Sequence, residues 1–461
     1  MVQWLPSALH LLLSSLLWTP KSAIKDTSLR FQLRHEHAVT NNSKTIFSDV
    51  PPNFTQESLR ISTRPLRAHR PVSQTTFHNA RMSSMLRTGS DMQPERVLWE
   101  DIEVLGPEVG ERETLSVLAK MTNNAYYESA EPIPKDWYDL GSDWNAVSQP
   151  GSFCLSRWGT DVVLSSFLLL FSVDGPLLTL GLQSYPFGWE PDQDGFRGYV
   201  FVSEDNSTVV LSIKGTSAGW MVGGGGPTTR KDKLNDNLLF SCCCARVGPT
   251  WRPVCDCYSG GYKCDQNCVE RSLVEDSLFY PIGTNLYNNI SYMYPEATIW
   301  LTGHSLGGAL ASLVGSTFGA PVVAFEAPAE KLAAKRLHLP SPPSTQHITH
   351  VFHTADPIAM GTCNGVASVC AIAGFAFESK CHLGQVISYD TVSKLNWTVD
   401  LRTHSIKVVI DTILAEDWEP GVDGKEGRQV PEPVFEDDCI ECFDWEFGDF
   451  KNLSSTGGCG L

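Results

Sequence analysis

The sequence predicts an α/β fold in which a mostly parallel sheet is covered by helices. Short apolar runs rich in β-branched and aromatic residues recur from about residue 190 onward, and helical stretches lie between some of them. The runs expected as strands are Tyr199 to Val202, Val209 to Ile213, Ala297 to Leu301, Val322 to Phe325 and Ile348 to Phe352.

Composition supports a folded chain with one large domain. The protein has 461 residues, of which 42% are hydrophobic, and this excludes a disordered or collagen-like chain. The first 100 residues hold 12 Lys and Arg against 7 Asp and Glu, so the remaining chain carries −22 of the total charge of −17. Such an acidic body argues against nucleic acid as a ligand, because phosphate binding needs clustered Lys and Arg.

An apolar run at the N-terminus indicates membrane targeting. Residues 1–18 are expected to form an uncleaved signal-anchor, because Lys21 occupies a position where signal cleavage requires a small residue. A cleaved signal peptide is the alternative. The charges flanking the run, Lys21 and Lys25, favour the orientation opposite to a lumenal body.

Glycosylation signals place the body on the lumenal side. The triplet Asn-x-Ser/Thr occurs at Asn41, Asn53, Asn206, Asn289, Asn396 and Asn452. Their spread over the chain favours a glycoprotein of the secretory pathway.

The cysteines point to the same compartment. Seven lie between Cys242 and Cys268, three between Cys363 and Cys381, and three between Cys439 and Cys459. In a cytosolic protein Cys255-x-Cys257 with Cys264-x₃-Cys268 could form a zinc site, but behind an apolar leader we expect disulfides in insertions of the fold. Spacing does not give their connectivity.

Two segments, one on each side of the main domain, differ from it in amino-acid composition. Residues 19–98 are rich in Arg, Ser, Thr and Pro, and are expected to form a basic, low-order lumenal stalk or an arm facing anionic lipid. Folding is expected to begin near Trp99, with an amphipathic helix from Arg112 to Asn124 in a domain spanning 99–420. Residues 421–461 are assigned to an acidic, Cys-containing tail.

Residues 147–183 interrupt this domain with an unusually apolar stretch. Asp174-Gly175-Pro176 cuts the stretch in the middle, which argues against a second membrane span. Val147-Ser148 can be encoded by a common intron start and Gln183 by a common intron end, so we interpret 147–183 as retained intron sequence. Sequencing the transcript tests this hypothesis, and a message that always contains these codons refutes it.

The strongest chemical signal is Gly303-His304-Ser305-Leu306-Gly307, which follows an apolar strand and precedes a small-residue helix. This strand–turn–helix elbow exposes a serine hydroxyl at its tip, and the helix N-terminus favours developing negative charge. We therefore expect Ser305 to be a nucleophile, with His304 as a packing residue of the elbow.

A nucleophilic serine needs a histidine base and a carboxylate, in the chain order Ser, acid, His for this elbow. Asp356 follows a strand and is the expected acid, with Glu326 as the alternative. Only His382 and His404 come after Asp356, and His404 is favoured because His382 adjoins Cys381, which a disulfide could hold in place.

The oxyanion of such a reaction needs two hydrogen-bond donors. The backbone N–H of Leu306 is expected to supply one, and Thr216, which follows a strand at Gly215, the other. The four-glycine run from Gly223 to Gly226 is interpreted as part of a mobile apolar flap over the site.

These motifs, in this order, resemble the class 3 lipase superfamily. The strings GHSLGGALA, SCCCARV, FYPIGTNLYNN and HTADPIAMGTCNG are similar to those of fungal autophagic-body lipases in particular, and such stretches cover most of residues 99–420. The chief departure is 147–183, where the family pattern runs directly from Trp-Asn-x to Ser-Tyr-Pro. The family triad falls on Ser305, Asp356 and His404.

The resemblance implies an α/β-hydrolase fold and a serine carboxylic-ester hydrolase, a triacylglycerol lipase or phospholipase that needs no metal or organic cofactor. It further implies a single-pass type II membrane protein of endosomes and multivesicular bodies, delivered through the endoplasmic reticulum and Golgi to the vacuole. There it would lyse autophagic bodies and multivesicular-body vesicles. Membrane phospholipids and acylglycerols are the implied substrates, and phosphoinositides implied ligands. A catalytically silent lipid-binding glycoprotein and a secreted esterase of another substrate class are the alternatives.

Overall fold

The computed structural model describes residues 28–39, 45–49, 59–86, 96–127, 135–138, 196–203, 205–217, 229–245, 253–276, 279–420 and 427–450. For 28–39, 45–49, 59–60 and 275–276 only the backbone is described. The N-terminal run, the apolar stretch 147–183 and the glycine run 223–226 lie outside these residues. Among the described residues, no helix has both the length and the apolar character needed to cross a membrane.

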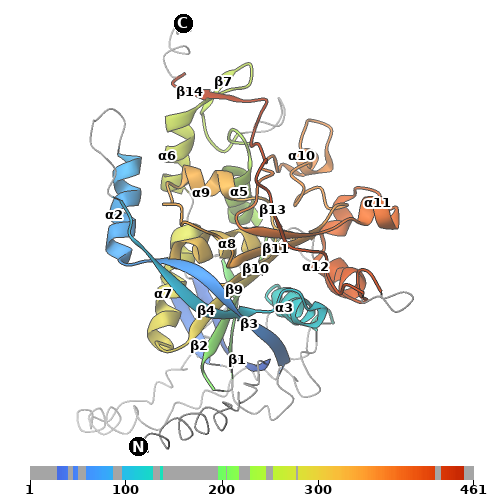
Figure 1. The fold of residues 1–461 in the computed structure, drawn as a ribbon. Helices are drawn as coiled ribbons and strands as arrows, with labels where there is room; N and C mark the ends of the chain where they lie inside the picture. The colour runs from blue at the N-terminus through green and yellow to red at the C-terminus, as the bar shows by residue number, and fades with distance from the viewer. Residues whose placement is uncertain are drawn as a thin grey trace, which may run out of the picture.

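The predicted α/β architecture is confirmed, with an 11-stranded sheet at its centre (Figure 1). The strands lie in the order β13-β12-β11-β10-β9-β6-β5-β1-β3-β4, with β2 paired to β1. The five from β12 to β6 run parallel, and antiparallel strands flank them. The strands of this sheet are β1 (Ser28–Val39), β2 (Thr45–Asp49), β3 (Leu59–Pro71), β4 (Trp99–Pro107), β5 (Arg197–Ser203), β6 (Thr208–Ile213), β9 (Thr298–His304), β10 (Val322–Phe325), β11 (Ile348–His353), β12 (Gln385–Tyr389) and β13 (Val434–Phe435).

Helices cover both faces of the sheet because alternate strand residues on each side are apolar. In β9, Ile299 and Leu301 pack toward α7 and α8, whereas Trp300 lies in the cluster on the side of α3. The helical elements are α2 (Gln74–Met85), α3 (Arg112–Asn124), α5 (Thr229–Phe240), α6 (Gln266–Asp276), α7 (Phe279–Met293), α8 (Leu306–Phe318), α9 (Lys331–Arg336), α10 (Val369–Ala373), α11 (Thr391–Leu395), η1 (Leu401–His404), α12 (Ile406–Val408) and η2 (Val409–Ile413).

The expected low-order stalk at 19–98 is wrong for its described part. There β1, β2, β3 and α2 form, and β1 joins the sheet by pairing with both β5 and β3. Ile61 and Ala68 are fully buried, so this segment contributes to the core. The many Arg and Pro residues of this segment did not suggest strands in the sequence. In the structure, arginines lie on the exposed side of β3, where Arg67 and Arg70 form ion pairs with acids of β4.

The acidic C-terminal segment is also part of the folded body in its described range, 427–450. Strand β13 extends the main sheet, and β14 (Glu446–Gly448) pairs with β8 (Lys263–Asp265) in a small sheet that also holds β7 (Tyr258–Gly260). Disulfides from Cys439 to Cys381 and from Cys442 to Cys242 fasten the segment covalently. The boundary expected at residue 420 therefore separates no structural units.

Candidate active site

The serine of the predicted elbow lies between the end of β9 and the start of α8. Ser305 has φ 55° and ψ −130°, a left-handed backbone conformation that is costly for a residue with a side chain and typical of functional turns. Side chains at the neighbouring glycines would not fit: a Cβ on Gly303 would meet the backbone of Gly307, and one on Gly307 would meet the carbonyls of Ile213 and Lys214. The local sequence thus imposes the strain that presents the hydroxyl.

Three predicted residues from distant parts of the chain meet at this turn. The Nε2 atom of His404 lies 2.9 Å from Ser305 Oγ, and its Nδ1 lies 2.6 Å from Asp356 Oδ2. Because a carboxylate can only accept, Nδ1–H donates to Asp356 and Nε2 is left to accept the serine proton. Each side chain is almost fully buried, so this hydrogen-bonded chain is shielded from water.

The pKa values of the two candidate acids, which are neighbours, are shifted in opposite directions. Burial alone would raise the pKa of Asp356, but the charge and hydrogen bond of His404 bring it well below its usual range. Burial, together with the charge of Asp356, raises the pKa of Glu326 well above its usual range. Of the two carboxyls, Glu326 is therefore the one whose environment favours the neutral form. Its Oε1 accepts from the backbone N–H of His353 at 3.2 Å.

His304 is more than a packing residue, because it bridges the elbow to the segment that carries His404. Its Nε2–H donates to the His404 carbonyl at 2.8 Å, so its Nδ1 accepts from the Tyr126 hydroxyl at 2.6 Å. Burial, with the nearby His404, lowers the pKa of His304 to about 3, which keeps the ring neutral. A second histidine, His353, holds the same segment through the Thr403 carbonyl at 3.0 Å.

The predicted oxyanion residues flank the serine. Leu306 is the first residue of α8, and a Cβ on Gly215 would lie 3.1 Å from that of Ser305, so the Gly215-Thr216 turn lies close to Ser305. Thr216 Oγ1 donates to Asp236 Oδ2 of α5 at 2.7 Å. The Gly-Thr turn is thereby tied to a helix.

A buried ion pair between Lys214 and Asp232 also holds the Gly215-Thr216 turn. Lys214 Nζ lies 3.2 Å from Asp232 Oδ2 and 2.7 Å from Ser217 Oγ, and the Ser217 N–H donates to Asp232 at 2.7 Å. Burial lowers the pKa of Lys214 to about 8 despite the carboxylate. Asp232 and Asp236 are four residues apart in α5 and lie on the same face of that helix, so this one face binds both Thr216 and Ser217.

The alternative base is engaged elsewhere. His382 contacts Glu436 Oε2 through Nδ1 at 3.1 Å and the Ala327 carbonyl through Nε2 at 3.3 Å. Its neighbour Cys381 is disulfide-bonded, as expected. Sequence reasoning missed Tyr126, Asp232 and Asp236, because no spacing rule connects them with the elbow; only their contacts in the fold do so.

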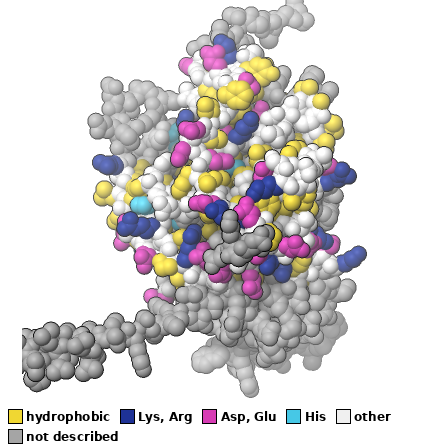
Figure 2. Space-filling view, turned by 45° about the vertical axis from the view of Figure 1, so that its right-hand side comes forward, with side chains coloured by type: hydrophobic (Ala, Val, Ile, Leu, Met, Phe, Trp, Pro, Cys, Tyr) yellow, Lys and Arg dark blue, Asp and Glu magenta, His cyan; other side chains and the backbone are white. Residues whose placement is uncertain are grey.

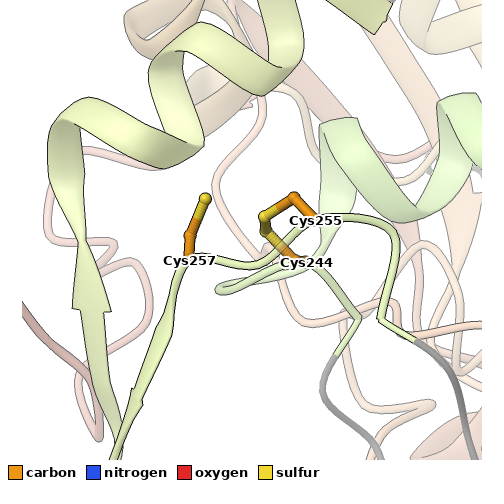
Figure 3. A group of neighbouring side chains, drawn as sticks. All are labelled: Cys244, Cys255 and Cys257. Carbon is orange, nitrogen blue, oxygen red and sulfur yellow. A yellow bond between two sulfur atoms is a disulfide. The ribbon is translucent and has the colours of Figure 1, made fainter. Parts of the chain in front are cut away.

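The prediction of disulfides is confirmed. Figure 3 shows Cys244 bonded to Cys255, with Cys257 nearby. Cys257 pairs with Cys268, so the three sulfurs of this cluster are occupied and the zinc alternative does not fit them. The further pairs are Cys243–Cys264, Cys242–Cys442, Cys363–Cys370 and Cys381–Cys439.

Of the candidate glycosylation sites, Asn206 and Asn396 are exposed, and Asn289 is half-buried on α7. Asn41, Asn53 and Asn452 lie outside the described residues.

A cavity of about 1180 Å³ lies between α2, α9 and the segment near Cys439, and its lining contains none of Ser305, Asp356 and His404.

A serine elbow, an acid and a histidine, in this chain order and at the carboxyl edge of a mostly parallel sheet, define the α/β-hydrolase fold. The family model "Lipase (class 3)" matches residues 277–362, which contain the elbow and Asp356. Lipase II from Rhizopus niveus is a solved structure with 16% identity and a TM-score of 0.20, covering 44% of this chain and 64% of its own.

Curated relatives are much more similar. A protein of Cryptococcus neoformans var. neoformans serotype D (strain B-3501A), named "Putative lipase ATG15", is 48% identical over 408 residues, covering 77% of this chain and 70% of its own. The proteins of that name from Mycosarcoma maydis and Saccharomyces cerevisiae (strain YJM789) are 47% and 42% identical, and the matches span 57% and 62% of their lengths. The chain belongs to the ATG15 lipase family.

Proposed function

We propose that this protein is a lipase that hydrolyses ester bonds of membrane glycerolipids, acting on phospholipids and triacylglycerols through an acyl-enzyme on Ser305. The observation that carries the proposal is the continuous hydrogen-bonded chain from Ser305 Oγ through His404 to Asp356, at 2.9 and 2.6 Å. The name of the relatives supports the substrate class.

In the first half-reaction, Ser305 Oγ attacks the ester carbonyl carbon while its proton passes to His404 Nε2. The imidazolium formed is stabilised by Asp356, whose lowered pKa keeps it ionised. Collapse of the tetrahedral intermediate breaks the bond to the alcohol oxygen, which takes the proton from His404. Water then repeats the sequence on the acyl-enzyme, releasing the fatty acid and restoring the serine.

The oxyanion of each tetrahedral intermediate would be held by the backbone N–H groups of Leu306 and Thr216. Because the Thr216 hydroxyl already donates to Asp236, the donor expected from this residue is its N–H. The buried contacts of Lys214 and Asp232 keep the turn in position before substrate arrives, which is the preorganisation that lowers the barrier.

We extend the proposal to the cellular setting implied by the family resemblance. The protein would enter the endoplasmic reticulum, pass the Golgi as a type II membrane protein anchored by residues 1–18, and reach the vacuole through multivesicular bodies. Its substrates there would be the membranes of autophagic bodies and multivesicular-body vesicles, with phosphoinositides among the lipids bound. Support comes from the ATG15 name of the relatives and from the disulfides, which suit an oxidising compartment.

The proposal is tested by fatty-acid release from anionic phospholipid vesicles at acidic pH, comparing the full chain with Ser305→Ala. We expect release by the parent chain and none above background by the variant, with equal thermal unfolding of the two. A folded, glycosylated parent chain that releases no fatty acid would favour the silent lipid-binding protein. Turnover of soluble esters alone would favour the esterase of another substrate class.

A further inference from the structure

A loop that begins five residues after Asp356 carries exposed apolar side chains. Val366, Val369 and Ile372 are 73%, 60% and 78% exposed, and they are spaced three residues apart around the short helix α10. Single exposed apolar residues are ordinary, but three within seven residues form a patch. We call residues 361–374 the α10 loop.

The α10 loop is braced rather than mobile in its contacts. The disulfide Cys363–Cys370 closes it, and the Cys370 side chain is fully buried beneath it. At its start, the N–H groups of Thr362 and Cys363 donate to the Pro357 carbonyl at 2.8 and 2.9 Å. The exposed side chains therefore stand on a fixed base, so they lose little conformational freedom when they become buried against a partner.

The base of the loop is tied to the candidate active site from two sides. Pro357 directly follows Asp356, and the far end of the loop rests on α5, where Lys233 Nζ donates to the Ala373 carbonyl at 2.7 Å and Asn237 Nδ2 to the Gly374 carbonyl at 3.0 Å. Helix α5 also carries Asp236, the partner of Thr216. A surface engaged by the loop would thus lie beside the site.

The charge pattern indicates what kind of surface that is. Residues 357–377 contain no Asp, Glu, Lys, Arg or His, although 19% of the chain is charged and the net charge is −17. An acidic protein is repelled by anionic membranes, so a charge-free apolar projection is the part that can approach and enter one without that cost. Figure 2, which turns the right-hand side of Figure 1 forward, shows acidic, basic and hydrophobic side chains interspersed over the face in view.

From this juxtaposition we propose that the α10 loop is a membrane anchor: Val366, Val369 and Ile372 insert into the outer layer of a phospholipid bilayer and hold the site against its substrate. The inference rests on the proposed function for its choice of partner, a lipid bilayer. It assigns this contact to a braced loop of the folded body, separate from the N-terminal apolar run and from the glycine run 223–226.

The test compares Val369→Ser/Ile372→Ser with a matched control, Tyr292→Ser. Tyr292 is 86% exposed near the end of α7, which Figure 1 places on the opposite side of the molecule from α10. Flotation with vesicles of phosphatidylcholine and phosphatidylserine measures binding. Every variant carries Ser305→Ala, so that the lipid is not consumed, and lacks residues 1–18, the proposed anchor, so that binding reports on the folded body. Hydrolysis of a soluble short-chain ester by the same variants with Ser305 intact measures the site itself.

We expect the double variant to need roughly tenfold or more lipid for half-maximal binding, because two buried apolar side chains are lost, whereas the control binds like the parent. Soluble-ester turnover should stay within about twofold, because neither side chain contacts the site. Ile372→Trp, which keeps the apolar character, should bind at least as well as the parent. Misfolding of the double variant would be recognised because it would also lower soluble-ester turnover.

Unchanged vesicle binding by the double variant overturns the anchor, even if the parent hydrolyses phospholipid. Equal loss of binding in Tyr292→Ser also overturns it, because the effect would then not belong to the loop. Conversely, a parent chain that releases no fatty acid, yet binds vesicles through the loop, refutes the proposed lipase activity and leaves the anchor standing.

Discussion

Replacing Asp356 with asparagine isolates the part that the buried carboxylate plays behind His404. The side chain keeps its size, so the change removes a charge without creating a cavity. Its amide can present an N–H to His404 Nδ1, which favours the tautomer that carries its proton on Nε2 and cannot accept from Ser305. We expect kcat for any ester to fall while KM changes little.

The magnitude follows from the geometry. With Nδ1 and Oδ2 2.6 Å apart, the centres of the two charged groups are about 4 Å apart, and at an effective dielectric constant near 20 their attraction is about 4 kcal/mol. Loss of that stabilisation in the transition state corresponds to about a thousandfold in rate. The unfavourable tautomer adds to it, so we expect a total loss of roughly 10³- to 10⁴-fold.

The matched control is Glu326→Gln, at the second carboxyl beside Asp356. Because the raised pKa of Glu326 favours its neutral form, glutamine changes its shape and charge little, and kcat should fall by no more than about tenfold. Both variants are assayed with a soluble ester, which separates chemistry from membrane binding. If Glu326→Gln were the more damaging change, the assignment of the acid would be refuted.

Three further predictions address the surroundings of the site. Thr216→Val should lower kcat by up to about 10²-fold with KM unchanged, because the turn loses its bond to Asp236; an unaltered kcat would show that this bond does not position the turn. Gly307→Ala should lower the free energy of unfolding by about 1–3 kcal/mol, measured by denaturant unfolding, because the added methyl meets the Lys214 carbonyl; unchanged stability would contradict the described packing. The His382–Glu436 pair should stabilise the protein most between about pH 4.3 and 6.5, the ordinary pKa values of the two groups. Burial lowers the pKa of His382, but the contact with Glu436 raises it on balance, so the stabilisation from His382 is lost as pH rises through this raised pKa. Burial raises the pKa of Glu436, but the contact with His382 lowers it on balance, so the stabilisation from Glu436 is lost as pH falls through this lowered pKa. Glu436→Gln should therefore cost about 2 kcal/mol inside that window and less outside it, and an equal shift of the thermal midpoint at every pH would count against the ion pair.

The sequence anticipated the parts of the fold that depend on local pattern. The helix from Arg112 to Asn124 has its predicted bounds, and its predicted inward side chains Leu115, Leu118, Ala119 and Met121 are buried. The elbow was recognisable because glycine and serine positions there are dictated by backbone geometry. Chain order then narrowed the histidines to two, and the distances agree with His404.

What the pattern did not reveal depends on long-range contact. Strands β1 and β3 carry polar and basic residues, and only their pairing with β5 and β4 makes them part of the sheet. The roles of Tyr126 and Asp236 likewise arise from partners far away in the sequence, His304 and Thr216. Disulfide pairing also depends on long-range contact, because the spacing of the cysteines does not indicate which partners Cys242, Cys243 and Cys244 have.

The three adjacent cysteines have a consequence for biosynthesis. Cys244 and Cys243 find their partners 11 and 21 residues downstream, which leave the ribosome soon afterwards, whereas the partner of Cys242 lies 200 residues later. Cys242 cannot form its bond until Cys442 has been synthesised, by which time the partners of Cys243 and Cys244 are already present. Completion of this crosslink therefore depends on the segment around Cys442, and a product that stops before it would keep an unpaired Cys242 thiol.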